Sequence, residues 1–360
     1  MKIAIEATAA CRPDRTGIPH YTIRLIESLL PMLASNGDVL QVGCRLSRWK
    51  ARQHRYLPAG TDDFWIQEPV WPIMPDFDVV HGTDAKVPNW GKAARLATVH
   101  DISVLLFDGI SSQRFRERKR REYQRLADTC HRIIAVSDVT RDDFAAAFDF
   151  PHDRIDVVHH GIGADFFPHG DHDHAAIRAK YQLPSQYLLF VGRVSFRKNT
   201  ARLLEALAQS AAFRHIPLAW VGTMSYGHRE LLPQLETLGL QDQVRFLGYV
   251  PQEDMPRLFS AASALLYPTN YEGFGIPVLE AMRSGVPVLG GNRGSVPEIA
   301  GGHAILVDPD SAEAIADGIN RVLQVDAPAR IAARQHAERF TWEQCARNTI
   351  AVYQRALDMR

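Results

Sequence analysis

The sequence has few cysteines, and their spacing excludes two classes of small domain. Four occur among 360 residues, and no two of them form a CxxC pair. A zinc ribbon needs closely spaced pairs, and a disulfide framework needs a denser set. We therefore expect reduced thiols in a cytoplasmic protein and no structural zinc. The four residues are Cys11, Cys44, Cys130 and Cys345.

Long apolar runs and an excess of one charge are also missing. No run of about 18 apolar residues occurs, so no transmembrane helix is predicted. The opening residues, MKIAIEATAA, include Glu6 and predict a strand rather than a signal peptide. Basic and acidic residues number 41 each, and this balance argues against nucleic acid as the main partner. The length of 360 residues and the 46% hydrophobic content suit two domains with separate cores.

The most informative stretch is YPTNYEGFGIPVLEAMRSGVPVLGGNRGSVPE, residues 267–298. The apolar run that leads into it predicts a buried parallel strand, and a short amphipathic helix follows a glycine loop. Gly273 and Gly275 let the loop backbone approach a ligand closely. The amides of Phe274, Gly275 and Ile276 open the helix, where amides favour phosphate. Because open α/β sheets bind ligands at the carboxyl ends of their strands, we expect a ligand site here.

Two carboxylates, Glu272 and Glu280, lie on either side of this loop with seven residues between them. A carboxylate accepts hydrogen bonds from neighbouring hydroxyls, so it suits a sugar or a ribose better than a phosphate. The pair could hold the two ends of a nucleotide sugar, with the phosphates on the amides between them. The alternative is that Glu272 caps the helix and Glu280 is an ordinary surface residue.

A second loop supplies positive charge. YLLFVGRV, residues 187–194, predicts the first strand of a second domain, and Gly192, Arg193 and Lys198 form the pattern GRxxxxKN. Two fixed cations at a strand end can stabilise a departing diphosphate without a metal. The alternative is that both cations are ordinary surface residues.

Two later strands end close to the path expected for a nucleotide. Gly222 lies at the carboxyl end of the first, in IPLAWVGTMSYG. Tyr249 and Val250 follow the second, in VRFLGYVPQ.

The N-terminal half also alternates strands and helices, but it lacks the GxGxxG pattern. A lone Gly17 before the first helix is therefore a weak phosphate signal. His100 and Asp101 follow a strand in RLATVHDISVL. His100 could donate a hydrogen bond to a sugar hydroxyl or cap the next turn. Asp101 could orient His100, hold an acceptor or cap a turn.

A strongly basic helix, QRFRERKRREYQRLADTC, is predicted over residues 113–130. A solvated helix face with salt bridges is the first interpretation. The alternative is attraction of residues 113–125 to anionic lipid headgroups or to a diphosphate-linked acceptor.

Residues 169–186 are predicted to connect an N-terminal domain, 1–168, to a C-terminal domain, 187–340. The connection contains three histidines with acids between them, which suggests a metal site. A flexible polar linker fixes no coordination geometry, however, so we expect none. The histidines are His169, His172 and His174.

The string EGFGIPVLE resembles the glutamate–seven-residues–glutamate motif of family-4 retaining glycosyltransferases, and GRVSFRKN, TVHD and RTGIPHY extend the resemblance over most of the chain. The resemblance implies the GT-B fold, an α/β fold in which two Rossmann-like domains face each other across a cleft. It also implies that residues 341–360 pack back on the first domain.

The resemblance implies a function for each motif. Glu272 would bind hydroxyls of the transferred sugar, and Glu280 would bind the nucleotide ribose. Arg193 and Lys198 would bind the diphosphate, and His100 would contact the donor sugar near its 6-hydroxyl. Further donor-binding residues would be Gly17, Gly192, Gly222, Tyr249, Val250, Gly273, Phe274, Gly275 and Ile276. Arg15, His20 and Asp101 are weaker candidates for the acceptor side.

From this resemblance we expect a retaining, metal-independent and cofactor-free glycosyltransferase of surface polysaccharide or lipopolysaccharide biosynthesis. The donor would be a nucleotide diphosphate sugar, first of all GDP-mannose, with UDP-glucose or UDP-N-acetylglucosamine as the alternative. The acceptor would be a glycan or a lipid-linked molecule. The enzyme would be cytoplasmic, with peripheral contact at the inner face of the membrane through residues 113–125 as a further expectation. A catalytically silent scaffold that binds sugar nucleotides is the rival of a different class.

Overall fold

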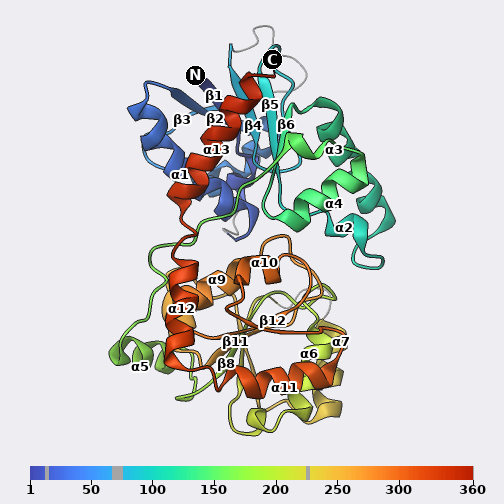
Figure 1. The fold of residues 1–360 in the computed structure, drawn as a ribbon, viewed down its shortest axis with the longest axis vertical. Coiled ribbons are helices and arrows are strands. Elements are labelled where there is room, and N and C mark those ends of the chain that lie inside the picture. The colour runs from blue at the N-terminus through green and yellow to red at the C-terminus, as the bar shows by residue number, and fades with distance from the viewer. Residues whose placement is uncertain (13–15, 67–75, 224–227, 360) are drawn as a thin grey trace. The chain divides into compact units, whose positions relative to one another are not determined.

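The structure is a computed structural model that describes residues 1–12, 16–66, 76–223 and 228–359. The chain divides into two compact units. In Figure 1 the colour runs from blue at the N-terminus to red at the C-terminus. The first unit combines residues 1–161 with 342–360, and the second contains residues 162–341.

The described part of the first unit forms a parallel seven-stranded sheet in the order β3-β2-β1-β4-β5-β6-β7. The strand order reverses beside β1, so the loops after β1 and β4 leave the sheet next to each other at its carboxyl edge. The strands are β1 (Lys2–Glu6), β2 (Val39–Arg45), β3 (Asp62–Ile66), β4 (Val79–Gly82), β5 (Ala94–Val99), β6 (Arg132–Ala135) and β7 (Ile155–Val157). The helices are α1 (Ile18–Ser35), α2 (Ser103–Leu106), α3 (Gln113–Thr129), α4 (Asp138–Phe148) and α13 (Trp342–Leu357), with short 3-10 turns η1 (Thr8–Cys11), η2 (Leu46–His54) and η3 (His152–Arg154).

Apolar spacing explains why α1 forms and which face it buries. Tyr21, Leu25, Leu29 and Leu33 recur at intervals of four residues, and all four are buried in the first core. Such spacing puts side chains on one helix face. This regular spacing is visible in the sequence and accounts for the buried face of α1.

The last helix, α13, completes the first core from the far end of the chain. It packs on α1, β4, β5 and β6, as the red helix in Figure 1 shows. His81 on β4 is fully buried and contacts the Tyr353 hydroxyl through Nδ1 at 2.8 Å and the Thr98 hydroxyl through Nε2 at 2.8 Å. Burial lowers the pKa of His81 to about 3, so the ring stays neutral.

The described part of the second unit forms a parallel six-stranded sheet in the order β10-β9-β8-β11-β12-β13. Its order reverses between β8 and β11, so the loops after these two strands start side by side. The strands are β8 (Leu188–Val191), β9 (Leu218–Val221), β10 (Val244–Gly248), β11 (Ala264–Tyr267), β12 (Val288–Gly291) and β13 (Ile305–Val307). The helices are α5 (Asp171–Lys180), α6 (Thr200–Gln209), α7 (His228–Leu238), α8 (Met255–Ser260), α9 (Ile276–Arg283), α10 (Val296–Ala300), α11 (Ala312–Val322) and α12 (Ala327–Ala337), with η4 (Ala212–Arg214).

The expected linker over residues 169–186 differs from the structure. Residues 171–180 form helix α5, which packs on α8 within the second unit. Lys180 and Tyr181 both bond to Asp254, at 2.6 and 2.5 Å, and His174 contacts the Ser260 hydroxyl at 2.9 Å. The boundary between the units therefore falls at residue 161, before the polar segment rather than within it.

The expectation of two Rossmann-like α/β domains is confirmed, because each unit is a parallel sheet with helical connections. Among the described residues, no helix has both the length and the apolar character needed to cross a membrane.

Candidate active site

In the second unit, hydrogen bonds join the loop after β8 to the loop after β11. Asn199 donates from Nδ2 to the carbonyl oxygens of Pro268, at 3.0 Å, and Pro309, at 2.6 Å. Asn270 donates from Nδ2 to the Phe196 carbonyl at 2.8 Å and from its backbone amide to the Arg197 carbonyl at 2.9 Å. The strand-order reversal places the two loops side by side, and these hydrogen bonds fix the position of one loop relative to the other.

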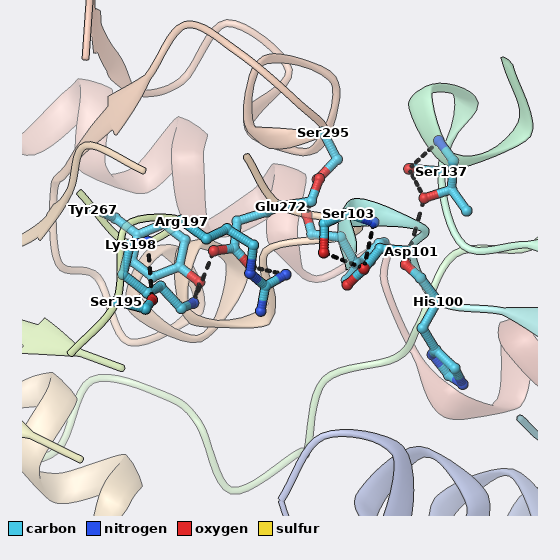
Figure 2. A network of polar contacts seen from close by, with 12 residues as sticks. His100, Asp101, Ser103, Ser137, Ser195, Arg197, Lys198, Tyr267, Glu272 and Ser295 are labelled. Atoms are coloured by element: carbon cyan, nitrogen blue, oxygen red, sulfur yellow. Dashed lines mark hydrogen bonds and ion pairs between the residues drawn. The ribbon is translucent and has the colours of Figure 1, made fainter. Parts of the chain in front are cut away.

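A buried carboxylate and a lysine meet between these loops. The Lys198 ammonium lies 2.9 Å from Glu272 Oε1 and donates to the Tyr267 hydroxyl at 2.5 Å. The Arg197 guanidinium lies 3.8 Å from Glu272 Oε2. Figure 2 shows the Lys198, Arg197 and Tyr267 side chains directed toward Glu272. Because Glu272 is only 6% exposed, its carboxylate charge is stabilised mainly by these two neighbouring cations.

Tyr267 supports the lysine from the last position of β11. Its ring centroid lies 4.5 Å from the Lys198 ammonium, a cation–π distance. Burial, helped by the charge of Glu272, raises the pKa of Tyr267 well above its usual value. The tyrosine therefore stays a neutral phenol and acts as a hydrogen-bond partner of Lys198 rather than as a second anion.

Two positions near Lys198 have space only for glycine. A Cβ atom on Gly192 would lie 3.1 Å from Lys198 Cε, which is tighter than nine in ten Cβ contacts in proteins. A Cβ atom on Gly222 would overlap the Gly192 carbonyl oxygen. That same oxygen accepts a hydrogen bond from Trp220 Nε1 at 3.0 Å. Gly192 and Gly222 thus set the position of the loop that carries Arg193, whose side chain is exposed.

Ser295 holds the loop that carries Glu272. Its hydroxyl is fully buried and lies 3.0 Å from the Glu272 carbonyl oxygen and 2.7 Å from the Phe274 carbonyl oxygen. The Ser295 amide also donates to the Glu272 carbonyl at 3.2 Å. Ser295 follows β12 in the sequence, so the Glu272 loop is braced from a third strand.

Glu280 lies on α9, the helix that follows the Glu272 loop. α9 begins at Ile276 after Gly275, which has φ +96° at the N-cap. The preceding Gly273 and Phe274 are buried, and Phe274 packs edge-on against Phe340 at 6.4 Å between ring centroids. Burial, and then the charge of Asp165, raise the pKa of Glu280 to about 8. Glu280 is therefore mainly protonated at neutral pH.

Tyr249 and Val250 follow β10 and differ in exposure. The Tyr249 side chain is 60% exposed, whereas Val250 is 5% exposed and packs inside. An exposed aromatic ring above a buried aliphatic anchor can stack on a planar ligand.

His100 lies at the carboxyl end of β5 in the first unit. Its Nε2 is 2.9 Å from the Thr83 carbonyl oxygen, so that nitrogen carries the proton. Its ring packs edge-on against Tyr21 at 4.8 Å and against His160 at 5.4 Å between centroids. Burial lowers the pKa of His100, so the ring is neutral. The expectation that His100 donates to a sugar hydroxyl is therefore corrected: its Nδ1 can only accept a hydrogen bond.

The three acceptor-side candidates have different surroundings. Asp101 Oδ1 accepts hydrogen bonds from the Ser103 amide at 2.9 Å and from the Ser103 hydroxyl at 2.5 Å, which is the geometry of an Asx turn (Figure 2). His20 packs against Trp342 at 5.8 Å between ring centroids. Arg15 lies outside the residues that the structure describes. Gly17, assigned to the donor from sequence, is the N-cap of α1 with φ +63°.

A cavity of about 230 Å³ opens beside His100 in the first unit. Asp84, Asp101, Arg12 and Lys119 supply its charged lining. Lys119 and hydrogen bonding to the Ala85 amide hold the pKa of Asp84 below its usual value, although burial opposes them. The cavity therefore offers hydrogen-bond acceptors for hydroxyl groups next to fixed positive charge.

The sequence predicted the Lys198 and Glu272 loops but missed the residues that brace them. Tyr267 and Ser295 lie within the informative stretch, yet nothing local marks a residue whose partners lie on another loop. Arg197 precedes Lys198 directly, and a second cation in that motif is the one signal that could have found it.

Family models match most of the chain. "Glycosyl transferases group 1" matches residues 173–339, and "Glycosyltransferase Family 4" matches residues 34–166. The O-antigen chain mannosyltransferase B of Escherichia coli is 34% identical over 98% of this chain and 99% of its own. The D-inositol 3-phosphate glycosyltransferase of Mycolicibacterium smegmatis is 31% identical over 65% of this chain and 55% of its own.

Solved structures with low sequence identity share the fold over the whole chain. The Anabaena protein Alr3699/HepE, in complex with UDP and glucose, has a TM-score of 0.77 at 20% identity, over 99% of this chain and 100% of its own. WaaG, a glycosyltransferase involved in lipopolysaccharide biosynthesis, has a TM-score of 0.69 at 19% identity, over 99% of both chains.

Proposed function

Because the chain belongs to the family-4 glycosyltransferases with the GT-B fold, we propose that it transfers mannose from GDP-mannose to a hydroxyl of a glycan or lipid-linked acceptor in surface polysaccharide synthesis, with retention of configuration. The mannose donor rests on the E. coli relative, which is named as a mannosyltransferase of the O-antigen chain. The alternative donor, a UDP-sugar, is favoured by the UDP and glucose bound to the Anabaena protein.

The observation that carries the proposal is the Lys198–Glu272 pair at the strand-order reversal of the second unit. A sugar nucleotide presents a diphosphate and hydroxyl groups a few ångströms apart. Lys198, with Arg193 on the same loop, would bind the diphosphate and stabilise its charge as the glycosidic bond breaks. Glu272 would then accept hydrogen bonds from the sugar hydroxyls.

With the diphosphate on Lys198 and the sugar on Glu272, the other parts of the donor would contact further residues. Glu280 would bind the ribose and Tyr249 would stack on the base. The amides at the start of α9 would face the diphosphate. Neutral His100 would accept a hydrogen bond from a donor-sugar hydroxyl through Nδ1.

Retention would follow from attack on the same face of the sugar. The acceptor hydroxyl would approach from the side of the departing diphosphate, and a phosphate oxygen would take its proton. Positioning and electrostatic stabilisation would then supply most of the rate enhancement, without a metal. A trapped covalent glycosyl-enzyme adduct would contradict this route.

The first test is thermal stabilisation by GDP, UDP, dTDP and ADP in the presence of EDTA. A ligand at 100 times its dissociation constant stabilises the folded protein by about 2.7 kcal/mol, which raises the melting temperature by several degrees. We expect the largest shift with GDP. A shift with UDP alone would replace the donor and keep the sites, and no shift with any nucleotide would contradict a transferase.

A variant separates the transferase from a silent scaffold. Glu272→Gln keeps the side-chain shape but weakens the contacts with sugar hydroxyls and with Lys198. We expect turnover to fall at least about 100-fold, the loss typical when a group that acts in the transition state is removed, while nucleotide stabilisation persists. Glu205→Gln, which changes a half-exposed glutamate on α6 that pairs with Arg202, is the matched control. A scaffold would have no turnover to lose in either variant.

A further inference from the structure

A cationic groove of about 410 Å³ runs along α3 of the first unit. We name it the α3 groove. Arg118, Arg121 and Arg125 line it from one face of the helix, and Lys86 and Arg45 line it from the loop after β4 and the end of β2. Ala85 and Leu126 are buried and give it an apolar floor. Charges from three separate chain segments thus converge on one concave surface.

The positive charge of the α3 groove is mostly unneutralised. Its one lining carboxylate, Glu122, lies 3.0 Å from the Lys119 ammonium outside the groove. Arg45 is paired with Glu6 at 3.3 Å. Within the described part of the chain, no carboxylate lies within 4.0 Å of the charged groups of Lys86, Arg118, Arg121 or Arg125. Because like charges four residues apart on a helix repel one another, a bound anion would stabilise this face.

The chemistry of the lining selects phosphate among anions. Guanidinium groups bind phosphate through paired, charge-assisted hydrogen bonds. Arg118 is held in place by stacking over Phe115, with its guanidinium carbon 4.7 Å from the ring centroid. Three arginines with a lysine opposite suit a dianion or a diphosphate better than a single carboxylate.

The α3 groove borders the cavity beside His100. Phe115, Lys119 and Tyr123 line that cavity from a neighbouring face of α3. The loop after β4 separates the two spaces, since Asp84 lines the cavity while Ala85 and Lys86 line the groove. One molecule could therefore place a sugar hydroxyl beside His100 and a phosphate group in the groove.

We propose that the α3 groove binds a phosphate or diphosphate group carried by the acceptor, so that the acceptor class is a phosphorylated or diphosphate-linked sugar. This inference rests on the proposed glycosyl transfer, because only that reaction requires an acceptor. The anion site itself lies wholly within the first unit and stands on the groove's own geometry.

Binding of inorganic pyrophosphate, measured by calorimetry, tests the site. Saturating GDP or UDP, whichever stabilises the protein, fills the nucleotide site during the titration. We expect Arg121→Gln/Arg125→Gln to weaken pyrophosphate binding roughly tenfold or more, since two charge-assisted contacts are lost. The control Arg114→Gln/Arg120→Gln removes the same charge from the same helix outside the groove and should bind as the wild type does. Circular dichroism of both variants checks that α3 stays folded.

Equal pyrophosphate affinity in the two double variants, or in the groove variant and the wild type, would overturn the proposal. Vesicles of phosphatidylglycerol provide a second arm. Vesicle binding that both double variants weaken alike, without pyrophosphate competition, would instead identify a diffuse membrane-binding face and also overturn it. Nucleotide stabilisation is a separate measurement, so its failure would remove the proposed donor chemistry without altering the pyrophosphate result.

Discussion

Glu280 is a carboxyl group that the fold holds protonated near neutral pH. Its pKa is raised from 4.5 to about 8, first by burial and then by the charge of Asp165. Between these two pH values the folded protein binds a proton that the unfolded chain releases. The stabilising contribution of this group is therefore complete below about pH 4.5 and is lost as the pH rises through about 8.

We predict that Glu280→Gln removes this loss of stability. Between pH 5 and pH 8.5 the wild-type free energy of unfolding should fall by up to a few kcal/mol more than that of the variant, because one pKa unit corresponds to about 1.4 kcal/mol. Urea unfolding at a series of pH values measures the difference. Glu236→Gln on α7, an exposed position, is the control and should follow the wild type. Parallel curves for the wild type and Glu280→Gln would contradict the raised pKa.

At the scale of residues, the sequence predicted the positions of the Lys198 and Glu272 motifs better than their contacts. Lys198 and Glu272 stand in compact motifs, and both lie where strand ends were expected. The hydroxyl of Ser295 and the phenol of Tyr267 contact residues 21 to 69 positions away. Such partners depend on the order of strands in the sheet, which no local pattern encodes. The expectation that His100 donates to a sugar hydroxyl failed for the same reason. The Thr83 carbonyl, 17 residues earlier, places the ring proton on Nε2 and leaves Nδ1 as an acceptor.

At the scale of elements, the close approach of two glycine turns positions the cationic loop. Gly222 follows β9 and has φ +141°, and its Cα faces the Gly192 carbonyl oxygen. Any side chain there must displace the β8 loop that leads to Lys198. The turn after β9 therefore controls the geometry of the turn after β8.

We predict that Gly222→Ala destabilises the second unit far more than Gly239→Ala. Gly239 also has positive φ, +67°, but faces open space, so its substitution costs only the backbone strain of about 1–2 kcal/mol. Gly222→Ala should add a further cost of about 1–3 kcal/mol from overpacking against backbone. Thermal unfolding of both variants gives the comparison. Equal melting temperatures would show that the β8 loop moves aside freely.

Elements with strong apolar periodicity were predictable, and one without it was not. α1 and α6 bury a regular apolar stripe, which the spacing of apolar residues in the sequence already shows. α5 buries only Ile177 among its ten residues, so its pattern resembles a polar linker. What orders α5 is a set of contacts with Asp254 and Ser260, more than 70 residues later.

At the scale of the whole molecule, the first unit depends on the end of the chain. The first core includes Trp342, Val352 and Tyr353 from α13, and the Tyr353 hydroxyl is a partner of the buried His81. Each large apolar side chain contributes about 1.5–3 kcal/mol by burial. Without α13 the first unit would lose several such side chains and leave His81 lacking one partner.

We predict that a chain ending at residue 341 keeps the second unit folded but not the first. Amide protons of β4 and β5 should exchange rapidly with solvent, while those of β8 and β11 should stay protected. Hydrogen exchange with mass spectrometry distinguishes the two units. A chain ending at Leu357, which retains all of α13, serves as control. Protection of β4 in the shorter chain would show that the first core is complete without α13.

The same placement of α13 sets an order of events during synthesis on the ribosome. Residues 1–161 emerge first but lack the helix that packs on them until α13 leaves the exit tunnel. The second unit, residues 162–341, is synthesised in between, which takes roughly 10 to 40 s at typical translation speeds. During that interval the apolar faces of α1 and β4 are exposed in the nascent chain. The unit whose synthesis starts first thus completes its folding last, and we expect chaperones to bind its exposed apolar surface.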